Sequence, residues 1–435
     1  MAESIPPASG QGVRSGRKKA GRKKGQRKSR APRSNAGSSL PPRSAGKNRP
    51  PVNAGGGTVE QPGTPARVAE IPAQVQAAQT SDHQTPVPPI NAPFRAAPFY
   101  RQAYAAIDLG TNNCRLLIAR PSGEHFVVID AFSRVVRLGE GLAQTGRLSD
   151  AAMDRALAAL HVCADKLRKR NVHLARSVAT EACRRATNGA DFIQRVRDET
   201  GIRLNIITAQ EEARLAVLGC HILLEQGSGP AMIFDIGGGS TEMVLVETGD
   251  TVPRILDWQS VPWGVVSLTE SIGAIADRDD ARAAAYAEMR RRVDEGFADF
   301  AVRVSPMRNA AQGEGRIRLL GTSGTVTTLA SLHLELPQYD RRAVDGLVVP
   351  AESMRDISQR LSSMSPAQRI ALPCIGRERA DLVVAGCAIL ESILDIWPAD
   401  RLGIADRGIR EGILRSLMAA GTEPSRGPKR RTEAA

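Results

Sequence analysis

The sequence predicts an α/β protein with two related lobes, preceded by a long basic tail. Three observations lead to this prediction. Strands alternate with helices over residues 103–417, a pattern typical of sheets covered by helices. A strand that ends in Asp-x-Gly and continues into a returning strand occurs twice, at 103–120 and at 231–247. A third strand enters a glycine turn before a helix at 316–334.

The tail is predicted over residues 1–100. This segment contains 15 of the 27 prolines, 16 of the 59 Lys and Arg residues, and only 4 of the 46 acidic residues. The net charge of +13 therefore resides almost wholly in the tail, and its lack of apolar periodicity predicts disorder. A basic segment of this kind can bind a polyanion such as RNA or polyphosphate without sequence specificity. A solvated tail with no partner explains the composition equally well.

The remaining sequence is close to neutral and supports a large aliphatic core. Hydrophobic residues make up 42% of the chain, whereas aromatic residues make up 3%. No apolar run is long enough to span a membrane, and no secretory signal pattern begins the chain. The six cysteines are scattered singly, without the spacing of a metal site or a disulfide framework. We therefore expect reduced thiols and a cytoplasmic protein.

The first lobe is predicted over residues 101–228. Ser149 can cap a helix that runs to about Arg170, and Gly201 can end a helix that begins at Asp191. Strands are expected at 103–110, 114–120, 125–138, 175–180 and 203–208, with a further helix at 209–226.

The second lobe is predicted over residues 229–417, with disorder expected again at 418–435. Its elements repeat the plan of the first lobe. Strands are expected at 231–240, 241–247 and 316–324, and helices at 279–304 and 325–334.

Three glycine-containing loops are candidate phosphate sites. In the first, Gly110 permits a tight turn, and Thr111 and Asn112 add polar side chains, although a plain hairpin also explains this loop. In the second, three consecutive glycines cost ordering entropy without adding packing, and close approach of the backbone to phosphate accounts for them. This second loop comprises Gly237, Gly238, Gly239, Ser240 and Thr241.

The third loop contains Gly321, Ser323 and Gly324 and comes directly before a helix. Backbone N–H groups at a helix N-terminus favour an anion, although a simple strand-to-helix turn is the alternative. Paired glycine hairpins in duplicated lobes, with a third loop before a helix, are the layout of the acetate kinase, sugar kinase, Hsp70 and actin superfamily. The layout predicts two ribonuclease H-like lobes with a phosphorylated ligand between them.

Further motifs indicate a family within this superfamily. Thr-Ala-Gln-Glu-Glu-Ala-Arg-Leu at 208–215 opens a helix, and Asp-Ile-Gly-Gly-Gly-Ser-Thr-Glu follows at 235–242. With the segments at 179–184, 377–381 and 406–412, these motifs closely resemble the exopolyphosphatase/guanosine pentaphosphate phosphatase (Ppx/GppA) family. The resemblance covers about 103–417 and lacks the C-terminal HD-like domain of longer members.

The resemblance implies that Glu212 is the catalytic base, which would orient and deprotonate water for attack on a terminal phosphorus. A carboxylate suits this role, because phosphoryl transfer depends mainly on positioning of the nucleophile. Otherwise, Glu212 is a solvated glutamate favoured by the helix dipole. Glu211 is expected to be structural, and Arg184 to contact substrate phosphate. Asp235 and Glu242 match acidic residues that hold the water or a divalent cation such as Mg²⁺. Asp108 is expected to face the same cleft and to complete the metal site.

The implied activity is removal of terminal phosphate from inorganic polyphosphate. Hydrolysis of guanosine pentaphosphate is the close alternative, because both substrates end in the same phosphoanhydride. A kinase or chaperone-like ATPase, or a regulator that binds polyphosphate or a nucleotide without catalysis, are the other classes. The family also suggests a homodimer.

Overall fold

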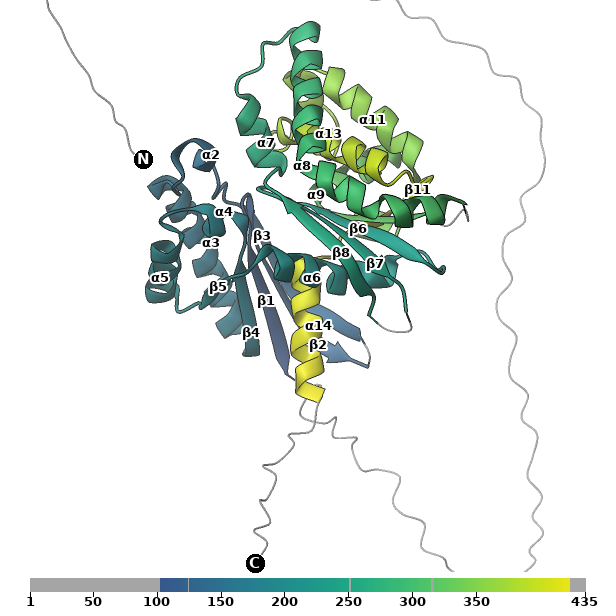
Figure 1. The fold of residues 1–435 in the computed structure, drawn as a ribbon. Coiled ribbons are helices and arrows are strands. Elements are labelled where there is room, and N and C mark those ends of the chain that lie inside the picture. The colour runs from purple at the N-terminus through teal and green to yellow at the C-terminus, as the bar shows by residue number, and fades with distance from the viewer. Residues whose placement is uncertain (1–101, 124, 250–251, 314–316, 423–435) are drawn as a thin grey trace, which may run out of the picture. The chain divides into compact units, whose positions relative to one another are not determined.

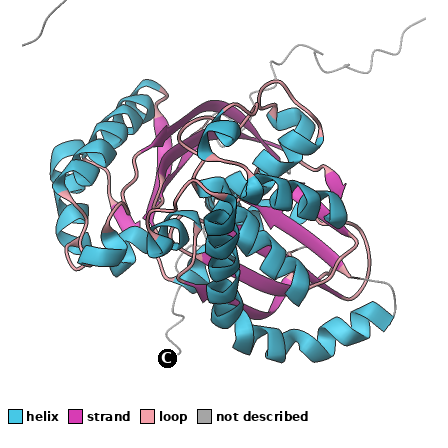
Figure 2. Cartoon of the chain, turned by 90° about the horizontal axis from the view of Figure 1, so that it is seen from above, coloured by secondary structure: helices cyan, strands magenta, loops and turns pink. Residues whose placement is uncertain are grey.

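The computed structural model describes residues 102–123, 125–249, 252–313 and 317–422, which belong to one compact unit. The disorder predicted for 1–100, and for 423–435, lies outside the described residues. Figure 1 shows two sheets, and Figure 2 shows helices to either side of the strands. No helix in the described ranges combines the length and the apolar character needed to cross a membrane.

The first sheet has the strand order β3-β2-β1-β4-β5. Strands β1, β2 and β3 form an antiparallel meander, while β4 pairs parallel to β1 and β5 parallel to β4. The elements of this lobe are β1 (Ala103–Leu109), β2 (Asn113–Ser122), β3 (His125–Val135), α2 (Leu142–Thr145), α3 (Asp150–Lys169), β4 (Val172–Ala179), α4 (Glu181–Arg185), α5 (Gly189–Thr200) and β5 (Leu204–Ile206).

The second sheet has the order β10-β11-β9-β6-β7-β8 and repeats the same plan. Strands β6, β7 and β8 form the meander, β9 pairs parallel to β6, and β11 parallel to β9. This repeated topology confirms the prediction of two related ribonuclease H-like lobes. The strands are β6 (Pro230–Ile236), β7 (Thr241–Glu247), β8 (Arg254–Val261), β9 (Arg318–Thr322), β10 (Val348–Pro350) and β11 (Arg401–Ala405).

The helices of the second lobe bury an aliphatic core against one face of its sheet. The longest continues through Pro306, so it extends beyond the predicted end at residue 304. The helices are α7 (Val265–Ile272), α8 (Asp279–Gly313), α9 (Gly324–His333), α10 (Arg341–Val344), α11 (Ala351–Ser363), α12 (Pro366–Ile370) and α13 (Leu382–Ile396).

Helix α6 (Ala209–Cys220) links the lobes and carries Glu212. One side of α6 packs on the first lobe through Leu215 and Ala216, and another packs on the second through Ala213 and Val217. The helix is shorter than the predicted 209–226, because the chain tightens into a 3₁₀ turn, η1 (His221–Leu223).

Helix α14 (Ile409–Thr422) returns to the first lobe and lies beside α6 (Figure 1). Its side chains Ile413 and Leu414 cover Tyr104 and Ala106 on one face of the first sheet. Residues 409–417 were expected in the second lobe and residues 418–422 were expected to be disordered. Both expectations fail, because residues 409–422 form one helix whose buried side chains pack on one face of the first sheet and against α6.

Local signals located several boundaries correctly. The Ser149 hydroxyl accepts a hydrogen bond from the backbone N–H of Ala152, which confirms the predicted cap of α3. Gly201 ends α5 with a φ of 75°, a left-handed conformation that glycine adopts without strain. Strands 125–138 and 203–208 were predicted too long, since the structure ends them at Val135 and Ile206.

Replacing Gly412 with Ala is expected to lower the free energy of unfolding by about 1–3 kcal/mol. A Cβ at Gly412 would lie 2.0 Å from the backbone oxygen of Leu215 in α6, so the two helices would have to separate. Denaturant unfolding measures the change. Gly313→Ala is the matched control, because nothing lies within 4 Å of the added Cβ. Equal stability of the two variants would contradict this account of the contact.

Candidate active site

Two glycine loops, one from each lobe, meet at a cavity of about 140 Å³. A Cβ on Gly239 would lie 2.5 Å from Oγ1 of Thr111, and a Cβ on Gly238 would lie 3.2 Å from the backbone nitrogen of Asn112. Side chains at these glycines would therefore force the loops apart. Gly110 and Gly237 line the same cavity, so these predicted phosphate-binding segments are brought together.

The third loop contributes Ser323 and Gly324 to the cavity. Ser323 is the N-cap of α9, and its hydroxyl accepts hydrogen bonds from the backbone N–H groups of Thr325 and Val326. Because that hydroxyl caps the helix, this turn contributes mainly backbone polar groups to the lining of the cavity.

Two residues of the predicted phosphate-binding loops are absent from the described lining of the cavity. Gly321 lies inside β9, where a Cβ would be 2.4 Å from the ring of Phe234, so close packing explains this glycine. Thr241 is fully buried, and its hydroxyl donates to the backbone oxygen of Trp263 at 2.7 Å. Both residues therefore pack or hydrogen-bond beneath the loops, outside the described lining.

Glu212 lies in the first turn of α6 and lines the cavity. Thr208 fixes this turn, because its hydroxyl accepts a hydrogen bond from the backbone N–H of Glu211. Burial, and then the charge of Glu242, raise the pKa of Glu212 well above its ordinary value. A carboxylate held in such surroundings is a stronger base than an exposed one.

Glu211 differs from Glu212 in the direction of its pKa shift and in its position relative to the cavity. Its carboxylate forms ion pairs with Arg214 and Arg176, and these hydrogen bonds lower its pKa to about 2. It does not belong to the described lining of the cavity, which agrees with the expectation of a structural role.

Four further carboxylates line the cavity beside Glu212, namely Glu181 and the three acidic residues predicted to hold a cation. Burial raises the pKa of Asp108, and raises the pKa values of Asp235 and Glu242 to about 7, with added repulsion from neighbouring carboxylates. Ser240 and Ser260 each donate a hydrogen bond to Glu242. The buried Oδ1 atom of Asp108 has no hydrogen-bond partner in the described part of the chain.

These carboxylates suit a divalent cation that also binds substrate. The described residues form no ready cage of three or more His, Cys, Asp or Glu side chains. Mg²⁺ requires no such cage, because it commonly takes one or two carboxylates together with substrate phosphates and water. A cation would supply a partner for the oxygen of Asp108 and would reduce the repulsion between the carboxyl groups.

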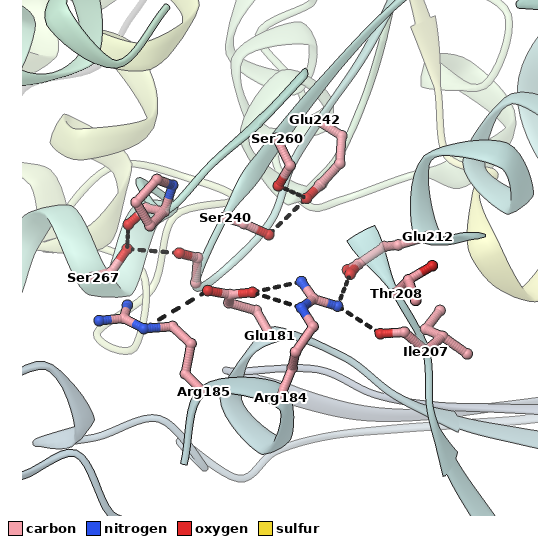
Figure 3. Close-up of polar contacts among 12 residues, drawn as sticks. Glu181, Arg184, Arg185, Ile207, Thr208, Glu212, Ser240, Glu242, Ser260 and Ser267 are labelled. Atoms are coloured by element: carbon pink, nitrogen blue, oxygen red, sulfur yellow. Dashed lines mark hydrogen bonds and ion pairs between the residues drawn. The ribbon is translucent and has the colours of Figure 1, made fainter. Parts of the chain in front are cut away.

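Arg184 lies beside Glu212 rather than in the described lining of the cavity. Its Nη1 donates to Glu212 Oε2 at 3.0 Å and to the backbone oxygen of Ile207 at 2.8 Å (Figure 3). Its other two nitrogens donate to Glu181. Each of the three nitrogens of Arg184 thus donates within the described structure, and direct contact of Arg184 with phosphate stays a prediction.

A second cavity, of about 390 Å³, adjoins the first and shares Asp108, Asp235 and Ser323 with it. Its arginines fall into two groups. Arg341 and Arg407 are paired with acidic side chains. The described structure gives the other three no carboxylate within ion-pair distance. These unpaired side chains are Arg115, Arg379 and Arg410.

Sequence reasoning assigned no role to these three arginines. Arg379 and Arg410 occur within the family motifs at 377–381 and 406–412, and that was the available signal. Arg115 follows the first glycine loop directly. Which arginines lack an acidic partner depends on the folded arrangement, so the sequence could not distinguish them from structural ones.

The fold and the site define a two-lobed enzyme that handles phosphate groups, with carboxylates and unpaired guanidinium groups around facing glycine loops. The model of the Ppx/GppA phosphatase family matches residues 117–420. The chain therefore belongs to the Ppx/GppA phosphatase family.

Individual relatives agree with this assignment. Exopolyphosphatase 2 of Mycobacterium tuberculosis is 33% identical over 328 residues, covering 72% of this chain and 98% of that protein. A putative exopolyphosphatase of Haemophilus influenzae is 27% identical over 317 residues, covering 72% of this chain and 90% of that protein.

Solved structures show the same fold. The Aquifex aeolicus member of the Ppx/GppA family superposes with a TM-score of 0.59 at 26% identity, covering 74% of this chain and 99% of that one. An exopolyphosphatase from Cytophaga hutchinsonii gives a TM-score of 0.63 at 24% identity, covering 73% and 98%. The second likeness concerns the fold alone.

Proposed function

We propose that this protein is an exopolyphosphatase, which hydrolyses the terminal phosphoanhydride of inorganic polyphosphate and releases orthophosphate. The observation that carries the proposal is the distribution of charge in the site. Glu212 shares the cavity of the facing glycine loops with Arg115 and Arg379, and these two arginines also line the adjoining cavity, where Arg410 joins them. A substrate whose leaving group is itself a polyanion matches this arrangement. The exopolyphosphatase names of relatives covered over most of their length support it.

In the proposed reaction, backbone N–H groups of the glycine loops hold the terminal phosphate. Glu212 orients a water molecule and accepts its proton as the water oxygen bonds to phosphorus. The bridging P–O bond breaks, and the shortened chain leaves with the negative charge on its own oxygen. Arg115, Arg379 and Arg410 bind the phosphates of that chain before and after the bond breaks, because guanidinium groups form strong charge-assisted hydrogen bonds with phosphate.

Asp108, Asp235 and Glu242 would hold Mg²⁺ or another divalent cation. When bound, the ion would neutralise charge on the phosphate oxygens. A cytoplasmic location and a homodimer stay predictions from the sequence.

The direct test supplies purified protein and Mg²⁺ with long-chain polyphosphate or with guanosine pentaphosphate, and follows free phosphate. Release mainly from polyphosphate is the expected result. Release from the nucleotide alone would move the assignment to guanosine pentaphosphate hydrolysis. Tight binding of polyphosphate without release from either substrate would identify a non-catalytic regulator.

Removal of divalent cations with a chelator is expected to lower phosphate release at least about 100-fold, since the carboxylate-rich cavity would repel an anionic substrate. Added Mg²⁺ should restore the rate. Thermal unfolding of the chelated protein serves as the control, because it shows whether the fold is kept. Full activity in the chelated protein would show that Asp108, Asp235 and Glu242 do not need to bind a cation for the reaction.

Deletion of residues 1–100 is expected to weaken the affinity for long polyphosphate and reduce its dependence on salt. The tail carries most of the net charge of +13, and each basic residue that contacts phosphate releases a counterion. Affinity is measured between low and physiological salt for long and short chains. Short chains provide the control, because they offer few phosphates beyond those that the active site would hold. Unchanged salt dependence for long chains would leave the tail without a role in substrate binding.

A further inference from the structure

Glu181 is a buried carboxylate at the junction of the lobes, and the proposed reaction gives it no role. It begins α4 directly after β4 and is only 9% exposed. It lines the cavity with Glu212, and its Cγ atom would lie 2.9 Å from a Cβ placed on Gly239. The side chain is therefore packed against the second glycine loop while its charged end remains beside the site.

The carboxylate of Glu181 is occupied by arginine. Oε2 of Glu181 accepts hydrogen bonds from both Nε and Nη2 of Arg184, while Arg185 approaches Oε1 at 3.8 Å. The third nitrogen of Arg184 reaches Glu212 Oε2 at 3.0 Å and the backbone oxygen of Ile207 (Figure 3). One planar guanidinium group thus joins Glu181 in α4 to Glu212 in α6.

We propose that Glu181 is a positioning residue for the catalytic base: it anchors Arg184, and Arg184 fixes one carboxylate oxygen of Glu212. This inference rests on the proposed function, in which Glu212 accepts a proton from water. With Oε2 of Glu212 held by Arg184, Oε1 is the oxygen that faces the water. Planar bidentate donors define direction as well as distance, so the anchor sets the angle at which the base meets the water.

A second carboxylate is needed because Arg184 would otherwise have Glu212 as its one acidic partner among the described residues. Without Glu181, two of its three nitrogens lose their acceptors and the guanidinium can rotate. The base then loses its fixed orientation, and Arg184 becomes available to bind the substrate phosphate. A positioning role therefore predicts a loss in kcat, whereas a phosphate contact predicts a rise in KM.

The test is a double-mutant cycle with Glu181→Ala, Arg184→Ala and the double variant, with kcat and KM measured on polyphosphate. Glu181→Ala is expected to lower kcat roughly 10- to 100-fold, the scale of a small misplacement of a reacting group. KM should change less than about twofold, since ground-state binding is kept. In the Arg184→Ala background, removing Glu181 should have almost no further effect.

Glu181→Gln retains the volume and one acceptor oxygen, so we expect a kcat between those of the wild type and Glu181→Ala. It also provides the measurement if the alanine variant folds poorly, with thermal unfolding used to compare the variants. The matched control is Glu211→Gln. Glu211 lies on α6 beside Glu212, but its carboxylate is paired with two arginines and is outside the described cavity lining. This control should keep the wild-type kcat.

Several results would overturn the inference. Additive losses in the cycle would mean that Glu181 does not act through Arg184, and a change confined to KM would assign the pair to substrate binding. Unchanged kcat in both Glu181 variants, beside an inactive Glu212→Gln enzyme, would reject the inference and leave the proposed function intact. Full activity of Glu212→Gln would instead reject the proposed function itself.

Discussion

Glu212→Gln is expected to lower kcat for phosphate release about 10²- to 10⁴-fold, the usual contribution of a general base. Glutamine keeps the size of the side chain and can still accept the hydrogen bond from Arg184, but it cannot take a proton from water. Binding of polyphosphate should remain close to that of the wild type, since Glu212 acts on the water. Phosphate release under saturating substrate, together with a direct binding measurement, separates the two effects.

The Glu211→Gln variant is again the control, because its carboxylate is ion-paired outside the described cavity lining. Loss of activity in both variants would indicate damage to the first turn of α6 rather than loss of a base. A Glu212→Gln enzyme as fast as the wild type would remove Glu212 from the reaction.

Arg379→Gln is expected to raise KM for polyphosphate about 10- to 100-fold. A hydrogen bond to a charged group contributes about 1.5–3 kcal/mol, and each 1.4 kcal/mol corresponds to a factor of ten. Arg379 lines both cavities, and within the described structure its side chain donates to the Thr328 hydroxyl, at 3.1 Å, and has no carboxylate within ion-pair distance, so its charge is available to a substrate. Initial rates over a range of substrate concentrations provide the measurement.

Arg377→Gln is the matched control for this prediction. Arg377 is an exposed arginine of the same segment and is absent from the described lining of either cavity. Its replacement removes the same charge from the same surface and should leave KM within about twofold of the wild type, as surface charges are screened by salt. A similar rise in KM for both variants would mean that general charge, rather than a specific contact, attracts the substrate.

The sequence predicted the lobes and loops because the responsible signals are local. Glycine and aspartate at the end of a strand, an alternation of strands and helices, and a serine before a helix all act over a few residues. The cap at Ser149 and the end of α5 at Gly201 are examples that the structure confirms. Because the two lobes repeat one plan, their glycine loops lie close together, as Thr111 and Gly239 do.

Contacts between distant segments could not be predicted in this way. The return of α14 to the first lobe depends on which apolar face remains uncovered, and no pattern within 409–422 specifies that face. Gly321 matched a loop motif, yet its position inside β9 follows from the packing of Phe234 on the neighbouring strand. The pairing of Arg184 with Glu181 and Glu212 likewise depends on α4 and α6 being placed together.

The position of α14 also determines the order in which the protein can fold during synthesis. Tyr104 and Ala106 belong to the first strand described, yet they are covered by Ile413 and Leu414. A nascent chain leaves the ribosome from its N-terminus, so the second lobe emerges before the first has its cover. Until α14 arrives, the part of this face that Ile413 and Leu414 cover stays open to water and to other chains, beside the part on which Leu215 and Ala216 of α6 pack. A chaperone that shields this surface would therefore act on the growing chain until α14 has emerged.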